Sequence, residues 1–377
     1  MAQKKYLPKS LLIWDVDNTL TDSAGFWGAA SGAAVKSLID NFALKPNAVR
    51  EAVLRAPAQY RFSDFGSLIT WLDRENVLPK GKTPAETHDI QTTLWAIRQN
   101  WYKAQKEMTV FYPQTASTLR TIRAHGTAMA VYTDTEASSL IRRMWFLARN
   151  AARDGSLSHE FEIFRLFDHF YSQPSIESDA AILRDIDPDF TLALKNRLTL
   201  FRPDPVTGRN RGKPSGENIG QILADYNTDP QFALMLGDSD KDGGSARLGG
   251  VDFAWLKFGA KLDRVTVKTA QTMASPSFKY GLSAIRQAMR DQNITPAVTL
   301  QRDISEILKK FDFIAGRGFN PCSERSGPHC PHTGVCPADQ KAAATIHRLR
   351  SAFHSREHLA PTGPATHFEP APPMPEL

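Results

Sequence analysis

Short apolar runs that end in clusters of polar residues are the feature that most constrains the fold of this chain. Residues 10–14 run directly into Asp-Val-Asp-Asn-Thr, residues 128–132 into Thr-Asp-Thr, and residues 232–236 into Gly-Asp-Ser. Such runs are typical of buried parallel strands, and open α/β sheets carry their chemistry at the carboxyl ends of those strands. Residues 251–258 form a fourth predicted strand, and helical spacing between the strands, as over 115–124, indicates β-α-β units. The sequence therefore predicts an α/β fold, a parallel sheet with helices on both faces.

A long stretch between the first two predicted strands shows apolar residues at helical spacing. The pattern covers residues 23–107 and is clear around Leu68 and Trp71. We therefore expect an all-helical segment inserted after the first strand. Trp71, Trp95 and Trp101 are expected in its core rather than against a ligand.

Two further stretches differ from the strand-and-helix pattern. In residues 174–212, Asp-Pro and Arg-Pro pairs interrupt short helical runs, which indicates another insertion. Residues 260–377 carry 15 Lys+Arg against 10 Asp+Glu, a net charge of +5 out of the +6 of the whole chain. We expect 260–360 to be a mostly helical or irregular extension, with helices near 280–290 and 302–311. The Pro-rich residues 361–377 are expected to be disordered.

All three cysteines lie in a Gly- and Pro-containing segment, residues 322–336. With two histidines they supply five side chains of the types that bind Zn²⁺: Cys322, His329, Cys330, His332 and Cys336. The spacing lacks the paired Cys-x2-Cys arrangement of strong zinc sequences. This absence favours the interpretation that the cysteines are reduced thiols without a metal. A zinc site at Cys322, Cys330, His332 and Cys336 stays open as the alternative.

Charge and hydropathy exclude several classes of protein. A net charge of +6 does not by itself imply nucleic acid, and scattered Lys and Arg in the last third favour a solvated surface over an acidic or nucleic-acid partner. No apolar stretch approaches the ~18 residues of a membrane helix, and Asp15 interrupts the first apolar run too early for a signal peptide. We expect a cytoplasmic protein without a membrane segment; the oligomeric state is left open.

Two groups of carboxylates follow predicted strands. Asp15 and Asp17 are two residues apart after the first strand, where they could hold a hard cation or divide the roles of nucleophile and acid/base. Asp238 and Asp242 follow the third long apolar run, where they could complete a magnesium site or form a Gly/Asp-rich surface turn.

Thr133 and Lys213 add a hydroxyl and a fixed positive charge. In chain order, Asp-x-Asp-x-Thr at 15–19, Thr133, Lys213 and Gly-Asp-x-x-x-Asp at 237–242 resemble the motifs of the haloacid dehalogenase superfamily. The resemblance implies a Rossmann-like catalytic core made of residues 1–22 and 108–259. It also implies a helical cap over residues 23–107.

For a phosphatase-type member, the resemblance implies a role for each motif residue. Asp15 would be the nucleophile that forms an aspartyl-phosphate, and Asp17 the general acid and base. Thr133, the N–H of Asp134 and Lys213 would hold the phosphoryl group. Mg²⁺ would bind Asp15, Asp238 and the main-chain carbonyl of Asp17, with Asp242 either as a further ligand or as a residue that acts on the ion indirectly.

The expected function is hydrolysis of a phosphate monoester on a small substrate. The resemblance argues against dehalogenation, because halide-removing members lack the second acid, here Asp17. Two alternatives remain open: a phosphotransferase or phosphomutase of the same fold, and a binding or regulatory protein whose basic extension engages a macromolecule.

Substrate choice depends on residues outside the motifs. The cap candidates are each individually more typical of structural or solvated residues: Phe26, Trp27, Tyr60, Arg61 and Arg98. The basic stretch 202–213 could meet a second phosphate or be a solvated loop, and it contains Arg202, Arg209, Arg211 and Lys213 against Asp204.

Overall fold

A computed structural model of the chain describes residues 6–55, 65–175, 183–201, 212–257 and 281–319. The chain divides into two compact units, Met1–Glu324 and Arg325–Leu377, and all described residues lie in the first. The predicted Cys/His segment 322–336 and the predicted disordered end 361–377 therefore lie outside the described residues. So do Tyr60 and Arg61.

Seven parallel strands form one sheet within the described ranges. In chain order they are β1 (Leu11–Trp14), β2 (Ala128–Glu136), β3 (His169–Gln173), β4 (Leu198–Leu200), β5 (Ala233–Gly237), β6 (Asp252–Leu256) and β7 (Val298–Leu300). Their spatial order is β4-β3-β2-β1-β5-β6-β7, and each neighbouring pair is parallel. The predicted α/β fold with a parallel sheet is confirmed.

The long helices near the start of the chain are α1 (Ser23–Phe42), α2 (Pro46–Arg55), α3 (Phe65–Arg74) and α4 (Pro84–Met108). The others in the described ranges are α5 (Thr115–Ala124), α6 (Ala137–Arg153), α7 (Ile163–Leu166), α9 (Pro188–Lys195), α10 (Gly216–Asp225), α11 (Asp240–Gly249) and α13 (Gly281–Asp291). Short 3₁₀ helices are η1 (Glu160–Glu162), η2 (Pro230–Phe232) and η4 (Ile304–Lys309). No helix that the structure describes combines the length and apolar character needed to cross a bilayer.

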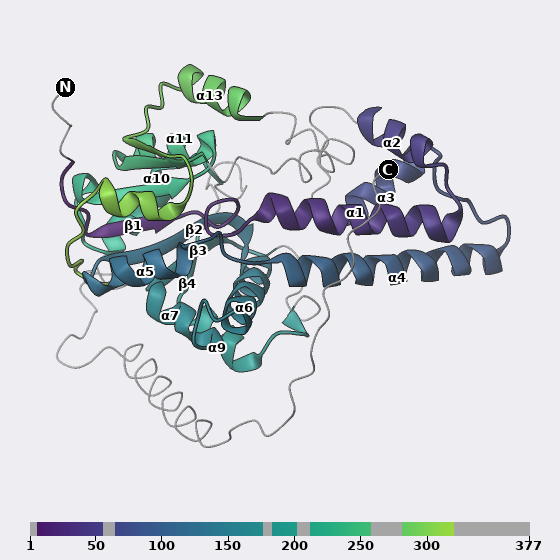
Figure 1. Cartoon of the computed structure of the whole chain (residues 1–377), viewed down its shortest axis with the longest axis horizontal. Helices are drawn as coiled ribbons and strands as arrows, with labels where there is room; N and C mark the ends of the chain where they lie inside the picture. The colour runs from purple at the N-terminus through teal and green to yellow at the C-terminus, as the bar shows by residue number, and fades with distance from the viewer. Residues whose placement is uncertain (1–5, 56–64, 176–182, 202–211, 258–280, 320–377) are drawn as a thin grey trace, which may run out of the picture. The chain divides into compact units, whose positions relative to one another are not determined.

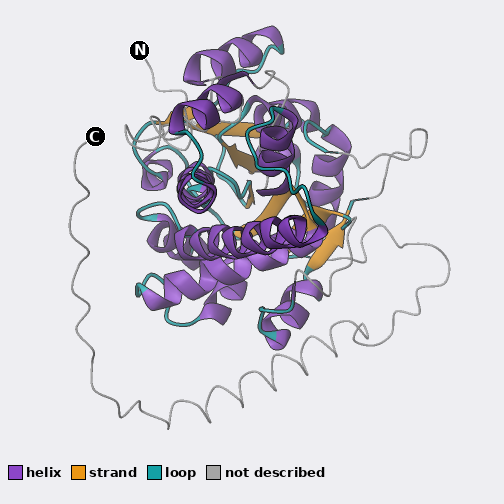
Figure 2. Ribbon diagram, turned by 90° about the vertical axis from the view of Figure 1, so that its right-hand side faces the viewer, coloured by secondary structure: helices purple, strands orange, loops and turns teal. Residues whose placement is uncertain are grey.

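Helices cover both faces of the sheet because the strand residues are apolar on both sides (Figure 2). All four β1 residues are buried: Leu12 and Trp14 pack with residues of α5, α6 and α9, whereas Leu11 and Ile13 pack with residues of α10, α11 and α13. This alternation follows from the two-residue period of a strand. It explains why the strands appear in the sequence as continuous apolar runs.

The helical segment after β1 has its own apolar core. Leu38 of α1, Leu68 and Trp71 of α3 and Trp101 of α4 are buried together there, and Figure 1 shows α1 and α4 running side by side. Thr83 starts α4 with a capping box, which satisfies N–H groups that a helix start leaves free. The expected helical segment is present.

Trp95 corrects one prediction about that core. It was expected to be buried with Trp71 and Trp101, but it is 58% exposed, whereas they are 4% and 2% exposed. Trp95 follows Leu94 on α4, and Ile97 and Trp101 take the inward positions of that helix. The expected face of α4 is buried, but Trp95 does not belong to it.

Two strands lie in stretches where no strand was expected. β4 lies in 174–212, which was interpreted as an insertion, and pairs with β3 at one edge of the sheet. β7 lies in 260–360, which was interpreted as an extension, and pairs with β6 at the other edge. Both are three residues long, too short for their periodicity to indicate a strand.

Candidate active site

The carboxyl ends of the central strands bring the sequence motifs together. From β1 the chain passes to β2, β3 and β4 on one side of the sheet and then to β5 on the other, so its direction reverses beside β1. Asp15 directly follows β1, Thr133 lies near the end of β2, and Asp238 directly follows β5. Ligands of open α/β sheets bind at such a reversal.

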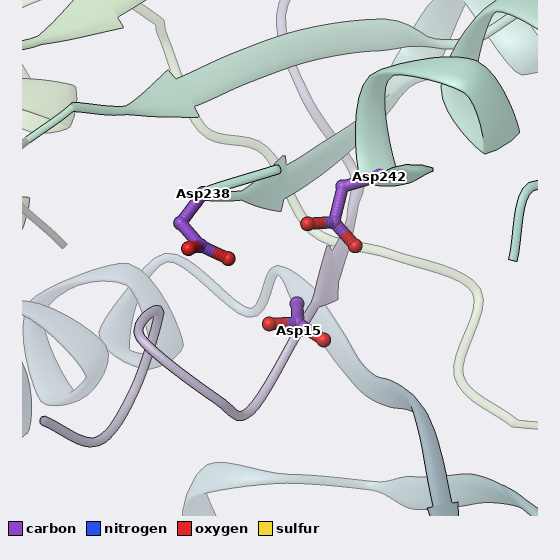
Figure 3. Close-up of side chains that lie close together, drawn as sticks. All are labelled: Asp15, Asp238 and Asp242. Atoms are coloured by element: carbon purple, nitrogen blue, oxygen red, sulfur yellow. The ribbon is translucent and has the colours of Figure 1, made fainter. Parts of the chain in front are cut away.

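Three carboxylates converge at this edge (Figure 3). Asp15, Asp238 and Asp242 each offer an oxygen, and these atoms lie within 4.8 Å of one another. Asp242 comes from the first turn of α11, where Ser239 and Asp242 form a capping box. A Cβ atom at Gly237 would lie 2.3 Å from the Asp242 side chain, so only glycine allows this approach.

Lys213 is buried between two of these acids. Its Nζ lies 2.5 Å from Asp15 Oδ1 and 2.8 Å from Asp242 Oδ1, and its side chain is 4% exposed. The ammonium also lies 4.6 Å from the centre of the Tyr132 ring. Three carboxylates and one ammonium leave two negative charges uncompensated when all are ionised.

Burial and mutual repulsion govern the charge state of the cluster. Burial raises the pKa of Asp15 to about 7, with Lys213 opposing and Asp242 reinforcing that change. Burial, together with the charges of Asp242 and Asp15, raises the pKa of Asp238 well above its ordinary value. Burial alone would lower the pKa of Lys213, but Asp15, Asp242 and Asp134 raise it well above its ordinary value, so it stays charged.

The donor set matches a hard divalent cation. Mg²⁺ and Ca²⁺ prefer carboxylate oxygens, and two uncompensated negative charges on close carboxylates match the charge of one such ion. Sulfur and imidazole, which favour zinc, are absent from this group of ligands. The residues present therefore fit the magnesium that the sequence predicts.

The Asp17 side chain is held apart from this cluster by hydrogen bonds. Ser23 Oγ donates to Asp17 Oδ1 at 2.5 Å, and Thr135 Oγ1 donates to Asp17 Oδ2 at 3.3 Å. Arg143 of α6 also donates from Nη1 to Asp17 Oδ2, forming an ion pair. Both oxygens of Asp17 thus have fixed partners beside the site.

Thr133 and Asp134 lie near the carboxyl end of β2, the strand that pairs with β1. Thr133 is 2% exposed, and its Oγ1 accepts a hydrogen bond from the Thr135 N–H at 3.1 Å. The Asp134 carboxylate accepts the main-chain N–H of Lys213 at 2.7 Å. The side chain of Asp134 therefore positions the residue that carries the buried ammonium.

The structure separates the predicted site residues into two sets. Those at the sheet edge are Asp15, Asp17, Thr133, Asp134, Lys213, Asp238 and Asp242. Among the predicted cap residues, Arg98 is exposed on α4, and Phe26 and Trp27 lie on α1, their side chains outside the described part. Of the basic stretch 202–213 only its end, Gly212 and Lys213, is described.

Sequence reasoning missed the residues around Asp17. Ser23, Thr135 and Arg143 hold its carboxylate, yet none of them belongs to the motifs. A pair of arginines within the largely apolar α6, shortly after the β2 motif, is the one sequence signal that could have indicated Arg143. Nothing local in the sequence indicates which acid that arginine reaches.

Comparisons with known proteins found similarity only among solved structures. No family model matches the sequence, and no curated protein matches it. A candidate β-phosphoglucomutase from Thermotoga maritima is 12% identical, with 80% of this chain and 98% of that chain covered and a TM-score of 0.46. A predicted phosphoglycolate phosphatase from Haemophilus somnus 129pt is 13% identical, with 80% and 97% covered and a TM-score of 0.42.

A third solved structure carries the family name itself. It is a haloacid dehalogenase-superfamily hydrolase, subfamily IA, from Geobacter sulfurreducens, 16% identical, with 66% of this chain and 90% of that chain covered and a TM-score of 0.29. The structural neighbours of this chain thus include hydrolases of the superfamily that its motifs resemble.

Proposed function

We propose that this chain hydrolyses a phosphate monoester of a small substrate with the help of Mg²⁺. One observation carries the proposal: the carboxylates of Asp15, Asp238 and Asp242 gather around Lys213 at the carboxyl end of the sheet. Buried carboxylates at this separation repel one another and are costly to desolvate unless cations accompany them. A site that concentrates such groups suits a reaction in which a carboxylate approaches an anionic phosphate.

Magnesium would be held by Asp15, Asp238 and Asp242, with the main-chain carbonyl of Asp17 as a further ligand. When bound, the ion neutralises charge on the transferring phosphoryl group. The oxygen donors and the uncompensated negative charge support this assignment over zinc or a metal-free site. The Asp17 carboxylate, positioned by Ser23, Thr135 and Arg143, would carry the proton that passes to and from the reacting oxygens.

The proposed reaction has two steps. An Asp15 carboxylate oxygen attacks phosphorus, the bond from phosphorus to the leaving oxygen breaks, and Asp17, in its protonated form, gives that oxygen its proton. Water then attacks phosphorus and transfers its proton to Asp17. The bond between phosphorus and the Asp15 oxygen breaks, which releases inorganic phosphate and restores both aspartates.

Three neighbouring groups are proposed to stabilise the phosphoryl group. Lys213 keeps a full positive charge beside Asp15 and reduces the repulsion between nucleophile and substrate. The Thr133 hydroxyl and the Asp134 N–H lie just beyond the β2 residues that pair with β1, where they would donate to phosphoryl oxygens. The hydrogen bond from the Lys213 N–H to the Asp134 carboxylate ties the two groups together.

The test is release of inorganic phosphate from a panel of phosphorylated metabolites and one aryl phosphate, with and without Mg²⁺. The wild type is compared with Asp15→Asn and with Asp73→Asn, a matched change at an exposed residue of α3. Release that requires Mg²⁺, is lost in Asp15→Asn and persists in Asp73→Asn supports the proposal. Equal release by Asp15→Asn contradicts the nucleophile, and transfer of phosphate to an alcohol acceptor in place of water identifies a phosphotransferase.

A further inference from the structure

Two arginines from different helices meet at one tyrosine ring where α4 and α6 contact each other. Arg98 of α4 donates to Tyr102 Oη from Nε at 3.3 Å and from Nη2 at 3.0 Å. The guanidinium carbon of Arg142, on α6, lies 5.5 Å from the centre of the same ring, and Arg142 also hydrogen bonds Tyr102. The corresponding distance for Arg98 is 5.4 Å.

These two positive charges have no acidic counterpart in the described part of the chain. No ion pair there involves Arg98 or Arg142, although arginines elsewhere pair with acids, as Arg120 does with Glu162 and Arg123 with Asp168. Burial lowers the pKa of Arg142, and the charges of Arg143 and Arg98 lower it further, while Tyr102 opposes them. An anion bound between two such guanidinium groups would offset their mutual repulsion and accept their N–H donors.

The arginine pair lies close to the proposed reaction along α6. Arg143 contacts Asp17, and Arg142 is the preceding residue, so their Cα atoms are about 3.8 Å apart. Successive side chains of an α-helix point about 100° apart, which allows Arg142 to face α4 while Arg143 faces Asp17. A ligand bound at Asp15 and extended past Asp17 toward α4 would therefore approach the pair.

The two arginines differ in exposure: Arg142 is half-buried, and Arg98 is the exposed member of the pair. Arg98 is exposed on α4, and its guanidinium carbon lies 5.8 Å from the centre of the Trp95 ring. Trp95, which is 58% exposed, therefore forms an aromatic surface beside Arg98. The planar guanidinium groups of arginine bind phosphate and carboxylate through paired N–H donors, which a lysine does not offer.

We propose that Arg98 and Arg142 bind a second anionic group of the substrate, remote from the phosphate that is cleaved. This inference rests on the proposed function and deepens it. The preferred substrate is then a phosphate monoester that carries a second phosphate or a carboxylate at its other end.

The test compares three phosphate monoesters of equal chain length: one with a neutral far end, one with a carboxylate there, and one with a second phosphate. The kcat/KM of each doubly anionic ester is divided by that of the neutral one. Wild type is compared with Arg98→Gln, Arg142→Gln and the control Arg74→Gln. Arg74 lies on α3, and its guanidinium carbon is 5.5 Å from the centre of the Trp71 ring. It therefore makes a similar arginine–aromatic contact, but with a ring other than Tyr102.

We expect the ratio to fall about 10-fold or more in Arg98→Gln and Arg142→Gln, as for loss of a hydrogen bond to a charged group. In Arg74→Gln it should equal the wild-type ratio. The two doubly anionic esters show whether the second group is a carboxylate or a phosphate. A wild type without preference, or a purely structural effect that lowers kcat/KM equally for all esters, overturns the inference.

If the wild type hydrolyses none of the esters, the proposed function fails and the anion site is tested separately. Inorganic pyrophosphate is titrated calorimetrically into wild type, Arg98→Gln, Arg142→Gln and Arg74→Gln. Weaker binding by the first two variants alone supports the anion site. Equal binding by all four proteins overturns it.

Discussion

Arg143 and Asp17 form an ion pair although they lie 126 residues apart in the sequence. The arginine comes from α6, and the aspartate lies in the turn that follows β1. Thr135 Oγ1 contacts both side chains, accepting from Arg143 Nη1 at 3.3 Å. Asp17 is thus oriented by the helix that follows β2 as well as by its own turn.

The ion pair predicts that Arg143 positions Asp17 for proton transfer. Arg143→Gln should lower kcat about 10- to 100-fold, because even a small displacement of an acid/base group slows proton transfer. Arg143→Lys should restore part of the loss, since it keeps the charge. Steady-state kinetics with saturating Mg²⁺ measure both, and Arg149→Gln, an exposed change on the same helix, is the control. Unchanged kcat in Arg143→Gln would refute the positioning role.

Lys213 is predicted to stabilise the fold as well as the site. Lys213→Met leaves Asp15 and Asp242 buried without their cation, and breaking a buried pair this way costs about 3–5 kcal/mol. Urea unfolding without Mg²⁺ measures the loss, and Lys241→Met, on the exposed surface of α11, should leave stability nearly unchanged. Equal stability of the two variants would show that other groups compensate the carboxylates.

Binding of Mg²⁺ should raise the stability of the wild type. At a concentration of 100 times the Kd, the free energy of unfolding rises by about 2.7 kcal/mol. Asp238→Asn removes one ligand and should lose most of this response, whereas Asp73→Asn should keep it. Thermal unfolding with and without Mg²⁺ provides the comparison, and a full response in Asp238→Asn would remove Asp238 from the proposed ligands.

The close approach at Gly237 makes a steric prediction. In Gly237→Ala the new Cβ would overlap the Asp242 side chain, and overpacking of this kind costs about 1–3 kcal/mol. We expect lower stability together with a weaker response to Mg²⁺, because Asp242 must move. Gly220→Ala on α10 is the matched control, since nothing lies within 4 Å of its added Cβ. The idea fails if both variants bind Mg²⁺ as the wild type does.

His169 predicts a pH dependence of stability. It is 5% exposed, stacked on Phe319 with ring centres 3.8 Å apart, and burial lowers its pKa from 6.5 to about 3. Between those values the unfolded chain binds a proton that the folded chain does not, so the free energy of unfolding falls as pH falls from 6.5 toward 3.

Replacing His169 removes that contribution. In His169→Gln the loss of unfolding free energy between pH 7 and pH 5 should be smaller than in wild type by about 2 kcal/mol. Urea unfolding at the two pH values measures it, with His88→Gln at an exposed position of α4 as the control. An identical loss in His169→Gln and wild type would mean that His169 titrates normally in the folded protein.

Much of the sheet could be predicted because its information is local. The apolar runs before Asp15, Thr133 and Asp238 each mark a strand through burial on both faces, and the order of the motifs brings their ends together. The helix at 115–124 was predicted within its observed bounds. The short edge strands β4 and β7 could not be predicted, since three residues carry no usable period.

The candidate site divides in the same way. Sequence alone determined which acids end which strands and that Lys213 accompanies them, because these residues are tied to motifs with a fixed order. Only the tertiary structure decided that Arg143 reaches Asp17, that Arg142 and Arg98 meet on Tyr102, and that Trp95 faces outward. Those contacts depend on how helices that are distant in the sequence pack and are rotated against one another. The local pattern of residues does not specify that packing.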